Sequence, residues 1–206
     1  MTNITTYSEL KQNLLDHGKR TDALGKLDLF IDLCEADIAD DLRVREMEAR
    51  ATGSTSTVSR FTSLPVGFIK MRRLQILVDS VYFDLSAKPV KDLNVLDSIG
   101  TPTQFSVTSE LEFNRISDQA YTLEMQYFKS LESLSDDYPE NDILTNYPMI
   151  YLAGSLKHFF NWSKQKEESA YWGSIYIDAV ARANKRSRKG RYGPNVSGFI
   201  HNGFVV

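Results

Sequence analysis

The chain has 206 residues, 42% of them hydrophobic and 25% charged, so it can bury the core of one globular domain or of one domain with an insertion. One cysteine, eleven glycines and six prolines exclude disulfide-stapled, collagen-like and most metal-finger classes. The sequence contains no apolar run of the roughly 20 residues that span a membrane and no signal-peptide pattern at its N-terminus. We therefore expect a soluble protein that is made in a reducing cytoplasm.

Charge is distributed unevenly along the chain. The net charge is −3, but residues 182–206 contain six basic residues and no acidic residue, which gives them +6 and leaves −9 for residues 1–181. A basic tail on an acidic body is typical of a terminal arm that binds nucleic acid or the acidic face of another subunit. A merely solvated, disordered end is the third interpretation of the same pattern.

Two helices are predicted at the start of the chain. Thr6 and Glu9 form a capping-box pattern ahead of the first helix, and Gly18 is a suitable stop. Residues 24–50 place apolar side chains at helical spacing, which predicts a long amphipathic second helix with Cys34 on its apolar stripe.

The pattern changes period after a Gly/Ser/Thr-rich break at residues 51–59. The clearest alternation runs from Tyr121 to Tyr127, where apolar side chains alternate with Thr, Glu and Gln, as in a half-buried strand. Residues 60–133 are therefore predicted to form a small antiparallel sheet that is inserted between helices.

Helical spacing returns after residue 141. Asn146 is predicted to cap a helix that Pro148 opens and that ends near Trp162, and its apolar character predicts the buried centre of the fold. A last helix is predicted from about Glu167 to Lys185. The glycines and the proline that follow predict an extended end.

The residue types that carry catalytic chemistry are scattered. His17, His158 and His201 have no metal-spaced partner, and they are interpreted as a surface residue, a partly buried residue and a tail residue. Phosphate loops, dinucleotide fingerprints and serine elbows are absent from the sequence. Asp136, Asp137 and Glu140 could hold a divalent cation, although acidic loops ahead of helices commonly supply N-terminal charge instead. We predict no enzyme activity, no cofactor and no metal site.

Several passages carry a resemblance that spans nearly the whole chain. Asn141, Leu144, Tyr147, Pro148 and Tyr151 lie in the most specific of them. The passages are YSEL, DLFIDLCEADIADDLR, SLPVGFIKMRRLQI, SLESLSDDYPENDILTNYPMIYLAGSLKHFF and AYWGSIYIDAVARAN. In this order they resemble the head-to-tail adaptors, also called connector or head completion proteins, of short-tailed and related phages.

The resemblance implies a structural virion protein of the neck between head and tail. It implies an α+β fold, mainly a bundle of about four helices (residues 1–59 and 134–185) with the β insertion (residues 60–133) and an extended C-terminal arm (residues 186–206). It also implies a ring, typically of twelve copies, that binds the portal and the tail or nozzle proteins. Genomic DNA would pass through its channel without sequence-specific binding.

The C-terminal arm is the predicted partner-binding site. Its basic residues are expected to pair with acids of a neighbouring subunit and to steer docking on the portal, while its apolar tip is expected to supply affinity. The predicted site residues are Arg182, Lys185, Arg186, Arg188, Lys189, Arg191, Tyr192, Phe199, Ile200, Phe204, Val205 and Val206.

Two other interpretations remain open from the sequence. The basic arm with Tyr192 and the tail phenylalanines could bind nucleic acid through phosphates and stacking, although the acidic body would repel DNA elsewhere. A small enzyme with an unfamiliar site is the third possibility, and it lacks a convergent set of polar residues.

Overall fold

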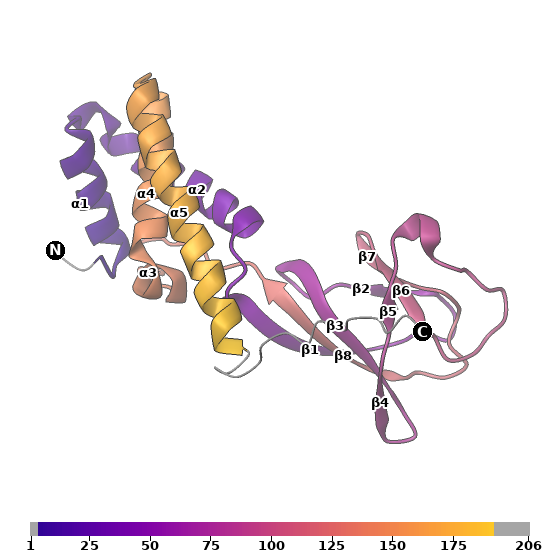
Figure 1. Ribbon diagram of the computed structural model, residues 1–206. Coiled ribbons are helices and arrows are strands. Elements are labelled where there is room, and N and C mark those ends of the chain that lie inside the picture. The colour runs from indigo at the N-terminus through magenta and orange to yellow at the C-terminus, as the bar shows by residue number, and fades with distance from the viewer. Residues whose placement is uncertain (1–3, 192–206) are drawn as a thin grey trace, which may run out of the picture. The chain divides into compact units, whose positions relative to one another are not determined.

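The computed structural model describes residues 4–191 and shows an α+β protein (Figure 1). Its contacts divide the chain into two compact units. The helical unit comprises the residues up to Glu46 and from Leu131 onward, and the β unit comprises Met47–Ser130. The α+β class predicted from the sequence is confirmed.

The helical unit has five α-helices within the described residues, one more than predicted. They are α1 (Tyr7–Gly18), α2 (Leu27–Asp41), α3 (Asp142–Asn146), α4 (Pro148–Trp162) and α5 (Lys166–Arg191), with single 3₁₀ turns at Thr21–Lys26 and Arg45–Met47. None of the helices found in residues 4–191 is both long enough and apolar enough to cross a bilayer.

Helix α4 forms the centre of the helical unit, as its composition predicted. It packs against α1, α2 and α5 (Figure 1), and Tyr151, Leu156 and Phe159 are completely buried. The bounds predicted for this helix, Pro148 to Trp162, are those observed. Three helices therefore place their apolar faces on one central helix.

The predicted capping box of α1 is confirmed. The Thr6 hydroxyl accepts the Glu9 N–H, while the Glu9 carboxylate accepts the Thr6 N–H. The helix ends at Gly18 as expected, but Lys19 is the residue in the left-handed conformation. Gly18 is needed for a different reason, because a Cβ there would overlap the Phe159 ring.

The prediction that α2 continues to Arg50 is wrong, because the helix ends at Asp41. Leu42 adopts an extended conformation and is buried together with Val44. The chain then enters β1, so Glu48 to Arg50 lie in a strand. An extended segment that buries the alternate side chains Leu42 and Val44 therefore stands where the last turns of the helix were predicted.

Asn146 was also predicted to cap α4, and this is wrong. It is the last residue of α3, and its side-chain amide donates to the Asp142 carbonyl. Asn141 caps α3 instead, since its Oδ1 accepts the N–H groups of Ile143 and Leu144. Pro148 still opens α4, with Tyr147 before it.

The β unit contains two four-stranded sheets rather than one small antiparallel sheet. Their orders are β1-β8-β3-β4 and β2-β7-β6-β5, and the β5–β6 pair is parallel. The strands are β1 (Glu48–Ser54), β2 (Phe61–Ser63), β3 (Phe68–Val78), β4 (Val81–Asp84), β5 (Ser86–Ala87), β6 (Gln104–Val107), β7 (Glu110–Phe113) and β8 (Thr122–Lys129), with a 3₁₀ turn at Val90–Asp92.

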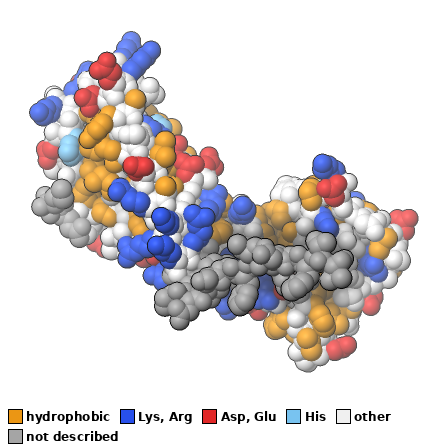
Figure 2. Space-filling model, in the orientation of Figure 1, with side chains coloured by type: hydrophobic (Ala, Val, Ile, Leu, Met, Phe, Trp, Pro, Cys, Tyr) orange, Lys and Arg blue, Asp and Glu red, His pale blue; other side chains and the backbone are white. Residues whose placement is uncertain are grey.

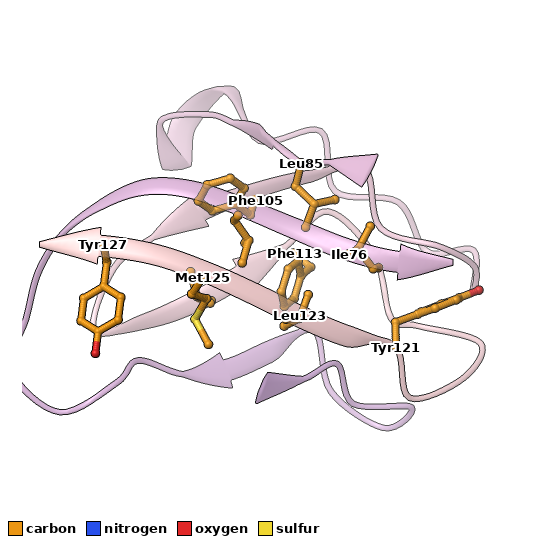
Figure 3. Packing of buried hydrophobic residues seen from close by; sticks show 10 residues of the cluster. Ile76, Leu85, Phe105, Phe113, Tyr121, Leu123, Met125 and Tyr127 are labelled. Carbon is orange, nitrogen blue, oxygen red and sulfur yellow. The ribbon is translucent and has the colours of Figure 1, made fainter. Parts of the chain in front are cut away.

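The two sheets share one apolar core (Figure 3). Strand β8 contributes Leu123, Met125 and Tyr127, which confirms the predicted two-residue alternation. Phe105 and Phe113 come from the second sheet and are almost completely buried. The β region starts at Glu48, earlier than predicted, because β1 pairs with β8 along its whole length.

Gly154 of α4 allows a close approach of α2 and α5 to the central helix. A Cβ at this position would overlap the Cys34 sulfur of α2 and would lie 3.1 Å from Tyr176 Cδ2 of α5. Gly173 of α5 offers a matched control, because a Cβ there would meet only Lys157 methylenes at 3.6 Å or more.

We expect Gly154→Ala to lower the free energy of unfolding by about 1–3 kcal/mol, the usual cost of overpacking a core. Gly173→Ala should be neutral or should raise it by up to about 1 kcal/mol through helix propensity. Urea unfolding of both variants, followed by circular dichroism, measures the difference. Equal stability of the two variants would contradict this packing.

Candidate docking surface on the helical unit

The C-terminal half of α5 presents a basic face. Ala183 and Ser187 point inward and are buried, while Lys185 and Arg186 between them are exposed. Figure 2 shows blue side chains gathered over this part of α5. The exposed members, which we call the basic face, are Arg182, Lys185, Arg186, Arg188 and Lys189.

The structure differs from the predicted extended arm at its beginning. Helix α5 continues to Arg191, so residues 186–191 are helical. Arg191 belongs to the helix, but its side chain is not among the described ones. The remaining predicted site residues, Tyr192, Phe199, Ile200, Phe204, Val205 and Val206, lie outside the described residues.

Two polar side chains on the inner face of α5 hold it against the end of α2. The Asn184 Oδ1 accepts the Arg43 N–H at 2.8 Å, and its amide donates to the Asp41 carbonyl at 3.1 Å. One turn later the Ser187 Oγ accepts the Arg45 N–H at 3.1 Å. We call these three bonds the α5 clamp. They satisfy backbone groups that the end of α2 leaves without helical partners.

Sequence reasoning missed the α5 clamp, although a signal was present. Asn184 and Ser187 lie three residues apart and interrupt a run of basic residues. On a helix this spacing puts both on one face, opposite most of the charges. A polar pair on the inner face of a helix indicates hydrogen bonds to a neighbouring segment.

The basic face is electrostatically uncompensated. None of its five side chains forms an ion pair with another residue in the described range 4–191. Several lie three or four residues apart, where like charges destabilise a helix by about 0.2–0.5 kcal/mol per pair. The helix macrodipole offsets part of this repulsion near the C-terminus. Such a face binds an acidic partner readily.

A groove of about 260 Å³ lies beside the basic face. Met149, Ile150 and Ala179 give it an apolar floor, while Arg182 and Arg186 stand at its edge. Met149 is 43% exposed although it lies in the most apolar helix. The groove suits an apolar side chain that is flanked by an acidic group.

The β3–β4 hairpin provides a second exposed apolar surface. Val81, Tyr82 and Phe83 of the edge strand β4 are all exposed. The sequence predicted strand structure here but not this exposure, because period-two patterns do not show which strand ends at a sheet edge.

The residues considered for other chemistry occupy structural positions. Cys34 is completely buried, and burial raises the pKa of its thiol to about 12, so it is a core residue as predicted. His158 lies 2.7 Å from the Asp37 carboxylate, which Lys157 also contacts. Within the described residues, no group of three or more His, Cys, Asp or Glu side chains could hold a metal ion.

Glu35 of α2 is a charged group in a largely buried position. Its Oε1 accepts the Leu134 N–H at 2.8 Å and the Tyr151 hydroxyl at 3.0 Å. Burial nevertheless raises the pKa of Glu35 above its ordinary value of 4.5. A raised pKa means that the protonated form stabilises the fold, and that this contribution is lost as pH rises through the folded-state pKa.

We expect Glu35→Gln to raise the midpoint of thermal unfolding at neutral pH and to change it little near pH 4, because the amide keeps one acceptor oxygen and removes the charge. Calorimetry of the wild type and the variant at both pH values gives the comparison. An equal change at both pH values, or a loss at neutral pH, would show that the charge is not the cause.

The model of the SU10 adaptor protein family matches residues 5–198, which span most of the helical unit and all of the β unit. No curated protein sequence matches the chain. The family match agrees with the resemblance to phage head-to-tail adaptors, and the chain belongs to the SU10 adaptor protein family.

Proposed function

We propose that the protein is a structural subunit of the phage neck that forms a ring between the portal and the tail. Membership of an adaptor family supports the class of protein. The single structural observation that supports assembly is the basic face of α5, five exposed cations without ion pairs among residues 4–191. Such a face is suited to an acidic neighbour in a larger particle.

The C-terminal segment is the proposed portal-docking element. Residues 192–206 follow α5 directly and contain the apolar tip residues Phe199, Ile200, Phe204, Val205 and Val206. A segment of this length spans at most roughly 50 Å, enough to reach a neighbouring protein. Burial of one large apolar side chain contributes about 1.5–3 kcal/mol, more than an exposed ion pair at about 0–1 kcal/mol. The tip therefore supplies affinity, and the basic face supplies steering.

The channel of the ring is proposed to pass genomic DNA without binding it. Residues 1–181 carry a net charge of −9, so the body of each subunit repels phosphates. An inner wall of this charge lets DNA slide.

Deletion of residues 195–206 should abolish binding to the portal ring and leave the fold intact, because every described helix and strand ends before residue 192. Binding of fluorescently labelled adaptor to the portal ring, with circular dichroism as the test of folding, checks this. Phe204→Ser should weaken binding and Asn202→Ser should not, which makes the second a matched control. Full binding by the truncated chain would contradict portal docking by this segment.

A nucleic-acid-binding role is the second candidate, and the same exposed cations favour it. The two functions respond differently to salt in a DNA-retention assay. A protein that neutralises several phosphates loses affinity steeply with salt. We expect little retention at physiological salt, because acids of α2 such as Asp32 and Asp40 are also exposed on the helical unit.

A further inference from the structure

Helix α2 carries an outer face whose charge is opposite to that of α5. Its exposed residues recur every three or four positions, so they share one face of the helix. Leu29 and Leu33 are 49% and 41% exposed. In full, the α2 outer face consists of Leu29, Asp32, Leu33, Ala36 and Asp40.

The acids of this face are available to a partner. Asp32 and Asp40 are exposed and form no ion pair with any residue in the described part of the chain. Leu29 and Leu33 leave apolar surface open beside these charges. The α2 outer face therefore combines apolar and acidic groups.

The outer face of α5 likewise combines an apolar group with charged groups, but most of its charges are basic. Tyr171 is 59% exposed near the start of the helix, and Arg182, Lys185 and Lys189 follow on the same side at three- and four-residue spacing. Asp178 is an acid on this side, and the exposed Glu167 lies on the same side four residues before Tyr171. We call Tyr171, Asp178, Arg182, Lys185 and Lys189 the α5 outer face.

Within one subunit, α2 and α5 run in the same direction at matching heights. Cys34 and Tyr176 meet at Gly154, and the Asp41 carbonyl accepts from Asn184. In each contact the residue of α5 follows its partner in α2 by nearly the same number of sequence positions. The two helices therefore advance together along their length at these contacts. Extending this register along both helices pairs Leu29 with Tyr171 and Asp40 with Arg182 in height.

A flat ring preserves these heights from copy to copy. The distance from Leu29 to Asp40 equals that from Tyr171 to Arg182, because eleven residues separate each pair, about 16 Å along a helix. When α2 of one copy packs beside α5 of the next, apolar groups meet apolar groups and acids meet bases. Asp178 then lies level with Ala36, not with an acid.

We propose that the α2 outer face of each subunit docks on the α5 outer face of the next, so that the occupant of each face is a second copy of this chain. The inference rests on the proposed ring and names its subunit contact. A two-fold dimer that paired the same two faces would stop at two copies, whereas a head-to-tail contact leaves one face of each kind free at every step and continues until a ring closes.

Engineered disulfides test the contact directly. Asp40→Cys and Arg182→Cys chains are prepared separately, mixed, and oxidised with and without the portal ring. The native Cys34 is completely buried and does not compete. We expect a cross-linked dimer from the mixture and none from either chain alone. Asp137→Cys, an exposed acid of the same unit outside this face, mixed with Arg182→Cys should give none.

Charge reversal gives a second readout. Asp40→Lys and Arg182→Glu should each weaken loading on the portal ring about tenfold, a change of about 1.4 kcal/mol, while Asp137→Lys should not. Both reversals in one chain should restore loading, because the pair is re-formed with exchanged signs.

The outcomes separate this contact from the proposed function. Cross-linking of the mixture supports the contact even if the wild type fails to load on the portal, a failure that would count against portal docking alone. Normal portal loading without cross-links in the mixture, or with cross-links between identical chains, would overturn the head-to-tail contact.

Discussion

The α5 clamp is the interaction on which the candidate site depends. Asn184 and Ser187 take up the backbone groups of Asp41, Arg43 and Arg45 where α2 gives way to an extended segment. These bonds fix the rotation of α5 about its own axis. Because the inner side of α5 is hydrogen-bonded to the end of α2 and the segment after it, the cations on the other side of α5 face solvent. The α5 clamp thus holds α5 in the rotation that exposes its basic side chains.

The close packing around α4 sets the second constraint. Gly154 lets Cys34 and Tyr176 approach α4 from two neighbouring helices, and this fixes α2 and α5 at one height. In the proposed contact between copies, this register would set acids of α2 level with bases of α5. A single glycine in the core would then influence a surface property of the proposed ring, through the register of two helices that both contact it.

Local signals in the sequence predicted the elements that depend on local physics. The capping box at Thr6, the proline that opens α4 and the alternation in β8 were all correct. The predicted ends of α2 and α5 were wrong. At the end of α2, burial of Leu42 and Val44 and the bond of Arg43 to Asn184, far apart in sequence, favour an extended segment that local patterns do not reveal. Of the predicted site, Arg182, Lys185, Arg186, Arg188 and Lys189 are exposed on α5, while the apolar tip lies outside the described residues.

The chain belongs to an adaptor family, and its helical unit carries a basic helix that precedes the C-terminal segment. The proposed function depends on assembly on the portal. The most direct measurement is the mass of the purified protein by light scattering, alone and mixed with the portal ring. We expect a discrete complex with many copies per portal. A monomer that ignores the portal, yet is retained on DNA at low salt, would contradict it.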